Sequence, residues 1–251
     1  MQPARSEAET SGQHVLRRRT LITEPFFRRN LPHWQPVGGT FFITYRLAGT
    51  LPGSVLSELN RENQRLRSLP RQPGYSENEW NLRIEKKIFA LWDEYLDRDK
   101  SMKWLSDPRV SRIVQDNLYH HAGAKYSLWA YVIMPNHVHV VLQPDEVWMK
   151  RFTAGDSERS QYEKGVLSAI LHSLRSFTAK KANEVLGRTG VFWQGEAYDH
   201  CVRDERELQR IIYYVENNPV QAGLARNPEG WRYSSAYDRV QRGLGPLDRI
   251  A

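Results

Sequence analysis

The spacing of apolar residues predicts a strand followed by two helices in the first half of the chain. Residues 40–47 are rich in β-branched and aromatic side chains, which is typical of a strand. Apolar side chains then recur at helical spacing over residues 55–67 and 77–96. Prolines and a glycine within residues 70–74 separate the two helices.

A third helix and a β-hairpin are predicted next. Asp107 followed by Pro108 is a typical helix start, with an aspartate cap and a proline in the first turn. Residues 126–134 and 137–143 are strand-like and flank a Pro-Asn pair. We therefore expect an antiparallel hairpin with a tight turn at this point.

The second half of the chain is predicted to be mainly helical. Residues 162–186 form a long helix whose apolar side includes Phe177, and Gly187 follows its end. A last helix covers residues 205–217, and Pro219 should end it because the residue before a proline resists helical geometry.

The chain divides into three parts. Residues 1–30 are polar and basic and are expected to form a flexible arm, which could touch phosphates or could equally be a solvated tail. Residues 31–240 form one domain, and residues 241–251 are a C-terminal tail. A chain of 251 residues is long enough to bury a sizeable core.

Composition narrows the class of partner and the compartment. With 36 Lys and Arg against 29 Asp and Glu, the net charge of +7 favours a polyanion such as nucleic acid, although charge alone is weak evidence. The single cysteine, Cys201, excludes an internal disulfide and any multi-cysteine zinc site. The sequence lacks an apolar run long enough to cross a bilayer and lacks a secretory signal, so we expect a cytoplasmic protein without a membrane partner.

Two histidines in the predicted hairpin are the first candidates for chemistry. His137 and His139 are two residues apart on a strand, so both imidazoles leave the same face and could reach one cation. Val138 and Val140 point to the opposite face, where they can anchor the strand in the core. A His-x-His pair is also common by chance in a chain with eight histidines, so a pair without any ligand fits the pattern as well.

The last helix offers a nucleophile and a third ligand. Its buried stripe is predicted to comprise Leu208, Ile211, Ile212 and Val215. Tyr214 and Asn218 lie one turn apart on the flank of that stripe, whereas Tyr213 faces nearly opposite. From these residues alone, a tyrosine at the core edge and a helix-ending asparagine are the simpler interpretation.

A family resemblance favours the catalytic interpretation of Tyr214 and Asn218 over the structural one. Residues 129–142 resemble the His-hydrophobic-His signature of single-tyrosine transposases. Further segments are similar to the REP-associated tyrosine transposases of bacteria: residues 42–52, 192–204, 214–224 and 231–237. The resemblance covers about residues 40–240, and the ordered set of motifs is more specific than any one of them.

The resemblance implies a fold and a site. It implies an α/β (α+β) domain of the ferredoxin-like, RRM-like type, in which helices pack on a central antiparallel sheet as in HUH endonucleases. It implies that His137, His139 and Asn218 hold a divalent cation and that Tyr214 is the nucleophile. The cation is expected to be Mg²⁺ or Mn²⁺, and mixed nitrogen and oxygen ligands suit Mn²⁺ better.

The same resemblance implies a reaction on single-stranded or hairpin DNA with REP-like repeats. Attack is expected to leave a 5′-phosphotyrosine and a free 3′-hydroxyl, and the reverse reaction would rejoin a DNA end. We expect a monomer or homodimer that works at the nucleoid. No residue in the sequence identifies itself as the base for Tyr214.

Other side chains are candidates for DNA contacts. The expected phosphate contacts are Arg175, Lys180, Lys181, Arg206 and Arg210. Four aromatic residues could stack on bases, although core packing is the better explanation for the tryptophans: Trp193, Tyr198, Trp231 and Tyr233.

Two alternatives stay open at this point. One is a DNA-binding protein of the same fold that recognises hairpin repeats but does not cut them. The other is a metal hydrolase that ignores DNA, whose activity would survive Tyr214→Phe.

Overall fold

A computed structural model describes residues 38–154 and 165–251 of the chain. The expected arm at residues 1–30 lies outside the described residues. Within the described part, none of the helices is both long and apolar enough to cross a bilayer.

A four-stranded antiparallel sheet forms the centre of the molecule. Its strands are β1 (Phe41–Leu47), β2 (Tyr126–Ile133), β3 (His137–Pro144) and β4 (Trp193–Cys201). They lie in the order β2-β3-β1-β4, and each neighbouring pair is antiparallel. The predicted first strand and hairpin are confirmed, and the order, with helices between β1 and β2 and between β3 and β4, is that of a ferredoxin-like α+β fold.

The fourth strand was not predicted from the sequence. Its segment carries Gly195, Glu196 and Asp199 and lacks the alternation of a half-buried strand. It forms an edge of the sheet by pairing along β1, from Leu47 opposite Trp193 to Phe41 opposite Cys201. Tertiary pairing, which local sequence does not report, therefore decides this element.

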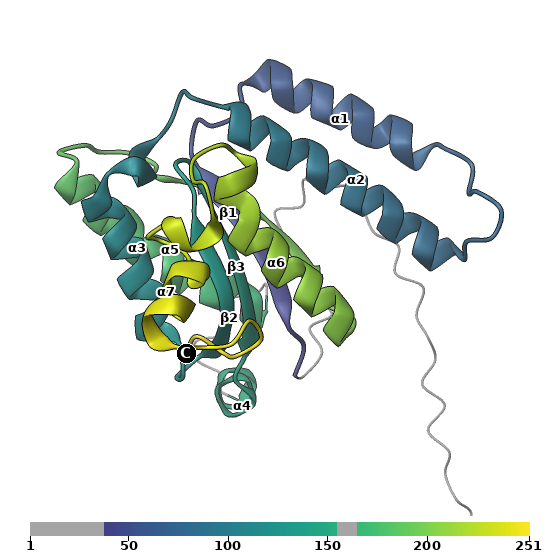
Figure 1. Cartoon of the computed structure of the whole chain (residues 1–251). Helices are drawn as coiled ribbons and strands as arrows, with labels where there is room; N and C mark the ends of the chain where they lie inside the picture. Colours follow the sequence, from purple (N-terminus) through teal and green to yellow (C-terminus); the bar gives the residue numbers. More distant parts are fainter. Residues whose placement is uncertain (1–37, 155–164) are drawn as a thin grey trace, which may run out of the picture.

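One face of the sheet is covered by α3 (Pro108–His121) and α5 (Val166–Val185), which contact each other (Figure 1). Asp107 caps α3 as predicted, accepting a hydrogen bond from the Arg109 amide. The strands point alternate apolar residues into this main core: Phe41, Ile43, Tyr45 and Leu47 of β1, and Val138, Val140 and Leu142 of β3. The remaining residues of β1 and β3 therefore face the other side.

The opposite face is covered by α2 (Glu77–Arg98) and α6 (Glu205–Gln221). Ile212 and Val215 of α6 pack against apolar residues of β2 and β3. Helix α1 (Gly53–Arg67) lies beside α2, which is the nearer of the two to the sheet (Figure 1). The α1–α2 pair has an apolar cluster of its own, which includes Leu59, Ile84 and Ile88.

Four shorter elements complete the described structure and were not predicted: η1 (Trp104–Ser106), α4 (Glu146–Ala154), η2 (Pro228–Gly230) and α7 (Ser235–Arg242). The chain end that was predicted to be a tail pairs with β2, since the Leu128 amide donates to Ala251 O and the Ile250 amide donates to Leu128 O.

Two expectations about helices are wrong. Helix α6 does not stop before Pro219 but continues to Gln221. Proline removes one amide donor from a helix, and here Asn218 and Pro219 are both buried, so packing outweighs the local preference. Phe177 of α5 was expected on the apolar side, but it is 50% exposed, because the buried stripe passes through Leu174 and Thr178 instead.

Candidate active site

The two histidines of β3 form the centre of the site. His137 and His139 are both fully buried on the face of the sheet opposite the main core. Their Nε2 atoms lie 3.0 Å apart. The strand periodicity therefore predicted correctly that both imidazoles leave one face and can meet at one point.

Hydrogen bonds fix how the two rings are oriented. His137 Nδ1 donates to Asn136 Oδ1 at 2.7 Å, and the Asn136 amide nitrogen itself donates to the carbonyl oxygens of Leu96 and Asp99. His139 Nδ1 lies 2.7 Å from the Thr44 hydroxyl, which can accept its proton. Both contacts use Nδ1, so each Nε2 is left to offer its lone pair to a ligand.

A carboxylate from α2 completes a group that could hold a metal ion: Asp93, His137 and His139. Asp93 Oδ1 lies 3.2 Å from His139 Nε2 and 3.9 Å from His137 Nε2. Sequence reasoning missed Asp93. The sequence shows only an acidic residue next to Trp92, and its burial is seen in the structure, where an acidic side chain without a partner would be rare.

The pKa values of His137 and Asp93 fit the binding of a cation. Burial, helped by the nearby His139, lowers the pKa of His137 to about 3, so its ring is neutral at physiological pH. Burial alone raises the pKa of Asp93, but contacts with His139, His137 and Tyr214 outweigh it and bring the pKa to about 2. Two imidazole nitrogens and a carboxylate oxygen are a suitable donor set for a divalent transition metal.

Two buried oxygen atoms near the histidine pair have no hydrogen-bond donor among the described residues. Among the described residues, neither Asp93 Oδ1 nor Asn218 Oδ1 receives a hydrogen bond. A buried carboxylate oxygen or amide oxygen without a donor is costly. A cation at the histidine pair would satisfy the Asp93 oxygen, so the residues present fit a metal site.

Tyr214 reaches this site from α6. Its hydroxyl donates a hydrogen bond to Asp93 Oδ2, and its ring lies against Phe42, Phe89 and His139. Tyr213 is 67% exposed, as the helix phase predicts. The structure therefore brings Tyr214, and not its neighbour, to the histidine pair.

The surroundings of Tyr214 hold its proton in place. Burial raises its pKa far above 10, and the negative charge of Asp93 and the hydrogen bond to it raise the pKa further. Asp97, one turn after Asp93, adds to this effect, and its own pKa is raised to about 7 by burial and by the charge of Asp93. A cation bound at the histidine pair would favour the tyrosinate over the phenol.

Asn218 is fully buried beside Tyr214. Its amide nitrogen lies 3.2 Å from Asp93 Oδ2 and 3.4 Å from the Tyr214 hydroxyl. The predicted proximity of Tyr214 and Asn218 is thus present, but the oxygen that lies next to the histidines belongs to the carboxylate of Asp93. The role of Asn218 as a metal ligand stays a prediction.

The five expected phosphate contacts have different surroundings. Arg175 donates from Nη1 to the carbonyl oxygens of Gln194 and Gly195, both at 2.9 Å, and so ties α5 to β4. Lys181 pairs with Glu184 at 2.9 Å. Lys180, Arg206 and Arg210 are exposed, and the last two lie on the helix that carries Tyr214. Their contacts with DNA stay a prediction.

Three of the four aromatic residues that could stack on bases make packing contacts or hydrogen bonds within the fold. Trp193 is in the main core, Trp231 donates to Ile133 O, and Tyr233 donates to Pro108 O. Tyr198 differs, because it lines a cavity next to the site.

Comparison with known proteins finds similarity to REP-associated tyrosine transposases. No protein-family model matches the chain. It is similar to the REP-associated tyrosine transposase of Escherichia coli (strain K12), with 23% identity over 123 residues, or 49% of this chain and 62% of that protein. A putative REP-associated tyrosine transposase of Haemophilus influenzae is 28% identical over 123 residues, covering 47% of this chain and 64% of its own length.

The predicted resemblance to REP-associated tyrosine transposases is confirmed by these relatives. The matched region spans less than two thirds of the length of either one. A solved structure described as a REP-associated tyrosine transposase bound to a REP hairpin aligns over 87% of this chain and 88% of its own, with 16% identity and a TM-score of 0.45.

Proposed function

We propose that this protein is a metal-dependent single-stranded DNA endonuclease and strand transferase that acts on hairpin repeats through a 5′-phosphotyrosine. The observation that carries the proposal is the convergence of three features from separate elements on one point: the histidine pair of β3, Asp93 of α2 and Tyr214 of α6. Curated relatives with the name of REP-associated tyrosine transposase support the choice of DNA.

In this proposal His137, His139 and Asp93 hold a divalent cation, with Asn218 as a further oxygen donor. Bound there, the cation would supply positive charge to a phosphate oxygen and to the tyrosine oxygen. Its identity as Mg²⁺ or Mn²⁺ is part of the proposal, with Mn²⁺ favoured by the nitrogen ligands.

The remaining chemistry belongs to the residues of the chain. Asp93 orients the Tyr214 hydroxyl by accepting its hydrogen bond, and the Asn218 amide steadies the same carboxylate. The Tyr214 hydroxyl gives up its proton and its oxygen forms a bond to phosphorus, while the bond from phosphorus to the 3′-oxygen breaks. The leaving oxygen takes up one proton to become a 3′-hydroxyl, so that the protons balance. The reverse attack by a 3′-hydroxyl restores the phosphodiester and frees the tyrosine.

DNA would be held by basic side chains near the site. Arg206 and Arg210 are exposed on α6, and we propose that they contact phosphates together with Lys180, Lys181 and Arg175. A protein with this activity would work in the cytoplasm at the nucleoid, as a monomer or homodimer.

The test is a cleavage assay on a labelled hairpin with single-stranded flanks, with Mn²⁺, Mg²⁺ or chelator. We expect a cut product and a protein-DNA adduct only with metal, loss of both in Tyr214→Phe, and retention in the matched variant Tyr213→Phe.

Two results would overturn the proposal. Binding of the hairpin without a cut under any metal would indicate a DNA-binding protein of the same fold. Cleavage that survives Tyr214→Phe would indicate a metal hydrolase.

A further inference from the structure

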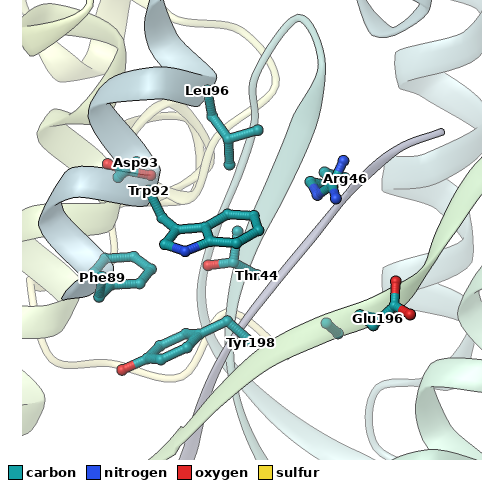
Figure 2. A pocket seen from close by; sticks show the side chains of 9 residues that line it. Thr44, Arg46, Phe89, Trp92, Asp93, Leu96, Glu196 and Tyr198 are labelled. Atoms are coloured by element: carbon teal, nitrogen blue, oxygen red, sulfur yellow. The ribbon is translucent and has the colours of Figure 1, made fainter. Parts of the chain in front are cut away.

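A cavity of about 40 Å³ lies beside the histidine pair, between α2 and the strands β1 and β4. One water molecule needs roughly 10–15 Å³ of such space, so the cavity can take a flat group of several atoms. Its walls include Phe89 and Trp92 of α2, Arg46 of β1, and Glu196 and Tyr198 of β4. Figure 2 shows the Trp92 ring between Phe89 and Arg46, with Glu196 and Tyr198 on the β4 side of the cavity.

The cavity shares a wall with the proposed metal site. Asp93 lines it while facing the histidines, and Thr44 lines it while its hydroxyl contacts His139. In the sheet, Thr44 pairs with His139 and Arg46 pairs with His137. A ligand in the cavity would therefore lie next to whatever phosphate is bound at the histidine pair.

The apolar part of the wall suits a stacked ring. Phe89 and Tyr198 lie with ring centres 4.6 Å apart and 30° between their planes, and Trp92 adds an indole face. Proteins that hold single-stranded DNA stack successive bases on such aromatic side chains.

The polar part of the wall can read the edge of a base. Arg46 is held by hydrogen bonds from Nη1 to the carbonyl and the hydroxyl of Thr50, and its guanidinium carbon lies 5.5 Å from the centre of the Trp92 ring. Burial lowers the pKa of Arg46 to about 10, with Glu196 opposing the shift, so it stays charged at neutral pH. Glu196 accepts a hydrogen bond from Gln194 at 2.6 Å, which fixes its carboxylate.

A fixed arginine and a fixed carboxylate favour one base. Arginine recognises the O6 and N7 acceptors of guanine. A carboxylate accepts hydrogen bonds from the N1 and N2 donors on the adjoining edge of the same base. The two side chains border one cavity, and pre-oriented groups of this kind bind with little loss of side-chain freedom.

We propose that this cavity is a nucleobase pocket that binds an unpaired guanine of the DNA strand directly next to the scissile phosphate. The inference rests on the proposed function, because it takes the strand at the histidine pair to be DNA. It assigns Trp92 and Tyr198 as stacking residues and Arg46 and Glu196 as the residues that select the base.

The test measures binding separately from cleavage. The probe is a fluorescent hairpin oligonucleotide with single-stranded flanks, in which each flanking position is replaced in turn by G, A, C, T or an abasic site. Affinity is measured by anisotropy in the Tyr214→Phe background with Mn²⁺, so that no strand is cut. For the otherwise unaltered chain, we expect one flanking position at which loss of guanine weakens binding by about tenfold.

Variants then assign that position to the cavity. Glu196→Gln keeps the size of the side chain and should abolish the preference for guanine at that position only. Glu184→Gln, on the exposed side of α5, is the matched control and should keep it. In Trp92→Leu, an abasic site at that position should no longer weaken binding. The fold of this variant is checked by circular dichroism, because Trp92 also belongs to the apolar cluster of α1 and α2.

The outcomes separate the two proposals. If the protein cleaves DNA but Glu196→Gln and Trp92→Leu leave every flanking preference unchanged, the pocket inference is wrong and the proposed function stands. If the preference at the sensitive position is for another base and depends on Glu196, the assignment of guanine is wrong. If the hairpin is neither bound nor cut, both proposals fail.

Discussion

The two faces of the sheet use the same strands for opposite purposes. On the α3 and α5 face, β1 and β3 present only apolar residues and Tyr45, and these form the main core. On the α2 and α6 face, the intervening positions include the apolar Phe42 and Val141. They also include four residues that are polar and buried: Thr44, Arg46, His137 and His139. The apolar face therefore anchors the strands in the main core. With the strands held in this way, the other face can bury polar groups, whose burial costs free energy.

The two faces differ in what their buried side chains depend on. Side chains in the main core need only close packing, whereas each polar group on the site face depends on a specific partner. His137 depends on Asn136, His139 on Thr44, and Asp93 on Tyr214. A change in the core should therefore cost free energy of unfolding, and a change on the site face should cost metal affinity.

The largest effect is expected from a core substitution. Ile43→Ala removes a fully buried side chain of β1, and such a deletion costs about 2–5 kcal/mol of the free energy of unfolding. Urea denaturation of the metal-free protein measures it, with Val191→Ala, at a site that is 70% exposed, as the control. A cost no greater than that of the control would mean that this face is not the core.

Asp93→Ala should have the next largest effect, on metal affinity. Loss of a direct ligand should weaken Mn²⁺ binding by more than the roughly 10–100-fold that loss of a supporting residue costs. Titration calorimetry of the chelator-treated protein measures the affinity. Glu94→Ala changes the exposed neighbouring carboxylate and should leave it unaltered. Equal affinity in Asp93→Ala would exclude Asp93 as a ligand.

Thr44→Val tests the support of His139 with a smaller change. The substitution keeps the shape of the side chain but removes the hydroxyl that contacts His139 Nδ1. We expect Mn²⁺ affinity to fall by about 10–100-fold, with little change in fold. Thr189→Val, at an exposed position, is the control for the same titration. An unchanged affinity would show that the ring needs no such partner.

The smallest effect is a pH dependence at Asp97. Its pKa is raised from 3.8 to about 7 in the folded protein. The protonated Asp97 side chain therefore contributes its full stabilisation of the fold below pH 3.8, and this contribution is lost as pH rises through about 7. Asp97→Asn cannot lose that proton. In metal-free protein it should be more stable than the unaltered chain at pH 8 and equal to it at pH 4, by thermal denaturation. The same difference in stability at both pH values would contradict the raised pKa of Asp97.

The sequence predicted those parts of the site that depend on local periodicity. The two-residue spacing of His137 and His139 and the helix phase of Tyr214 each follow from one element. Asp93 could not be found in this way, because it meets the histidines only after α2 has packed on the sheet. Strand β4 was missed for the same reason, since its pairing with β1 decides it.

The proline in α6 shows the limit of a local rule. Pro219 predicts a helix end, yet α6 continues because Asn218 and Pro219 are buried by their neighbours. Asn218 lies in the last part of this longer helix, where its amide nitrogen is 3.2 Å from Asp93 Oδ2. Tertiary packing therefore overrides a local sequence preference close to the candidate site.

Mass spectrometry of the protein-DNA adduct tests the central claim most directly. The protein is incubated with the hairpin substrate and Mn²⁺, digested with protease and nuclease, and the modified peptide is sequenced. The account predicts a nucleotide joined through its 5′-phosphate to Tyr214. A modified Tyr213, a 3′-linked nucleotide, or cut DNA with no adduct would contradict it.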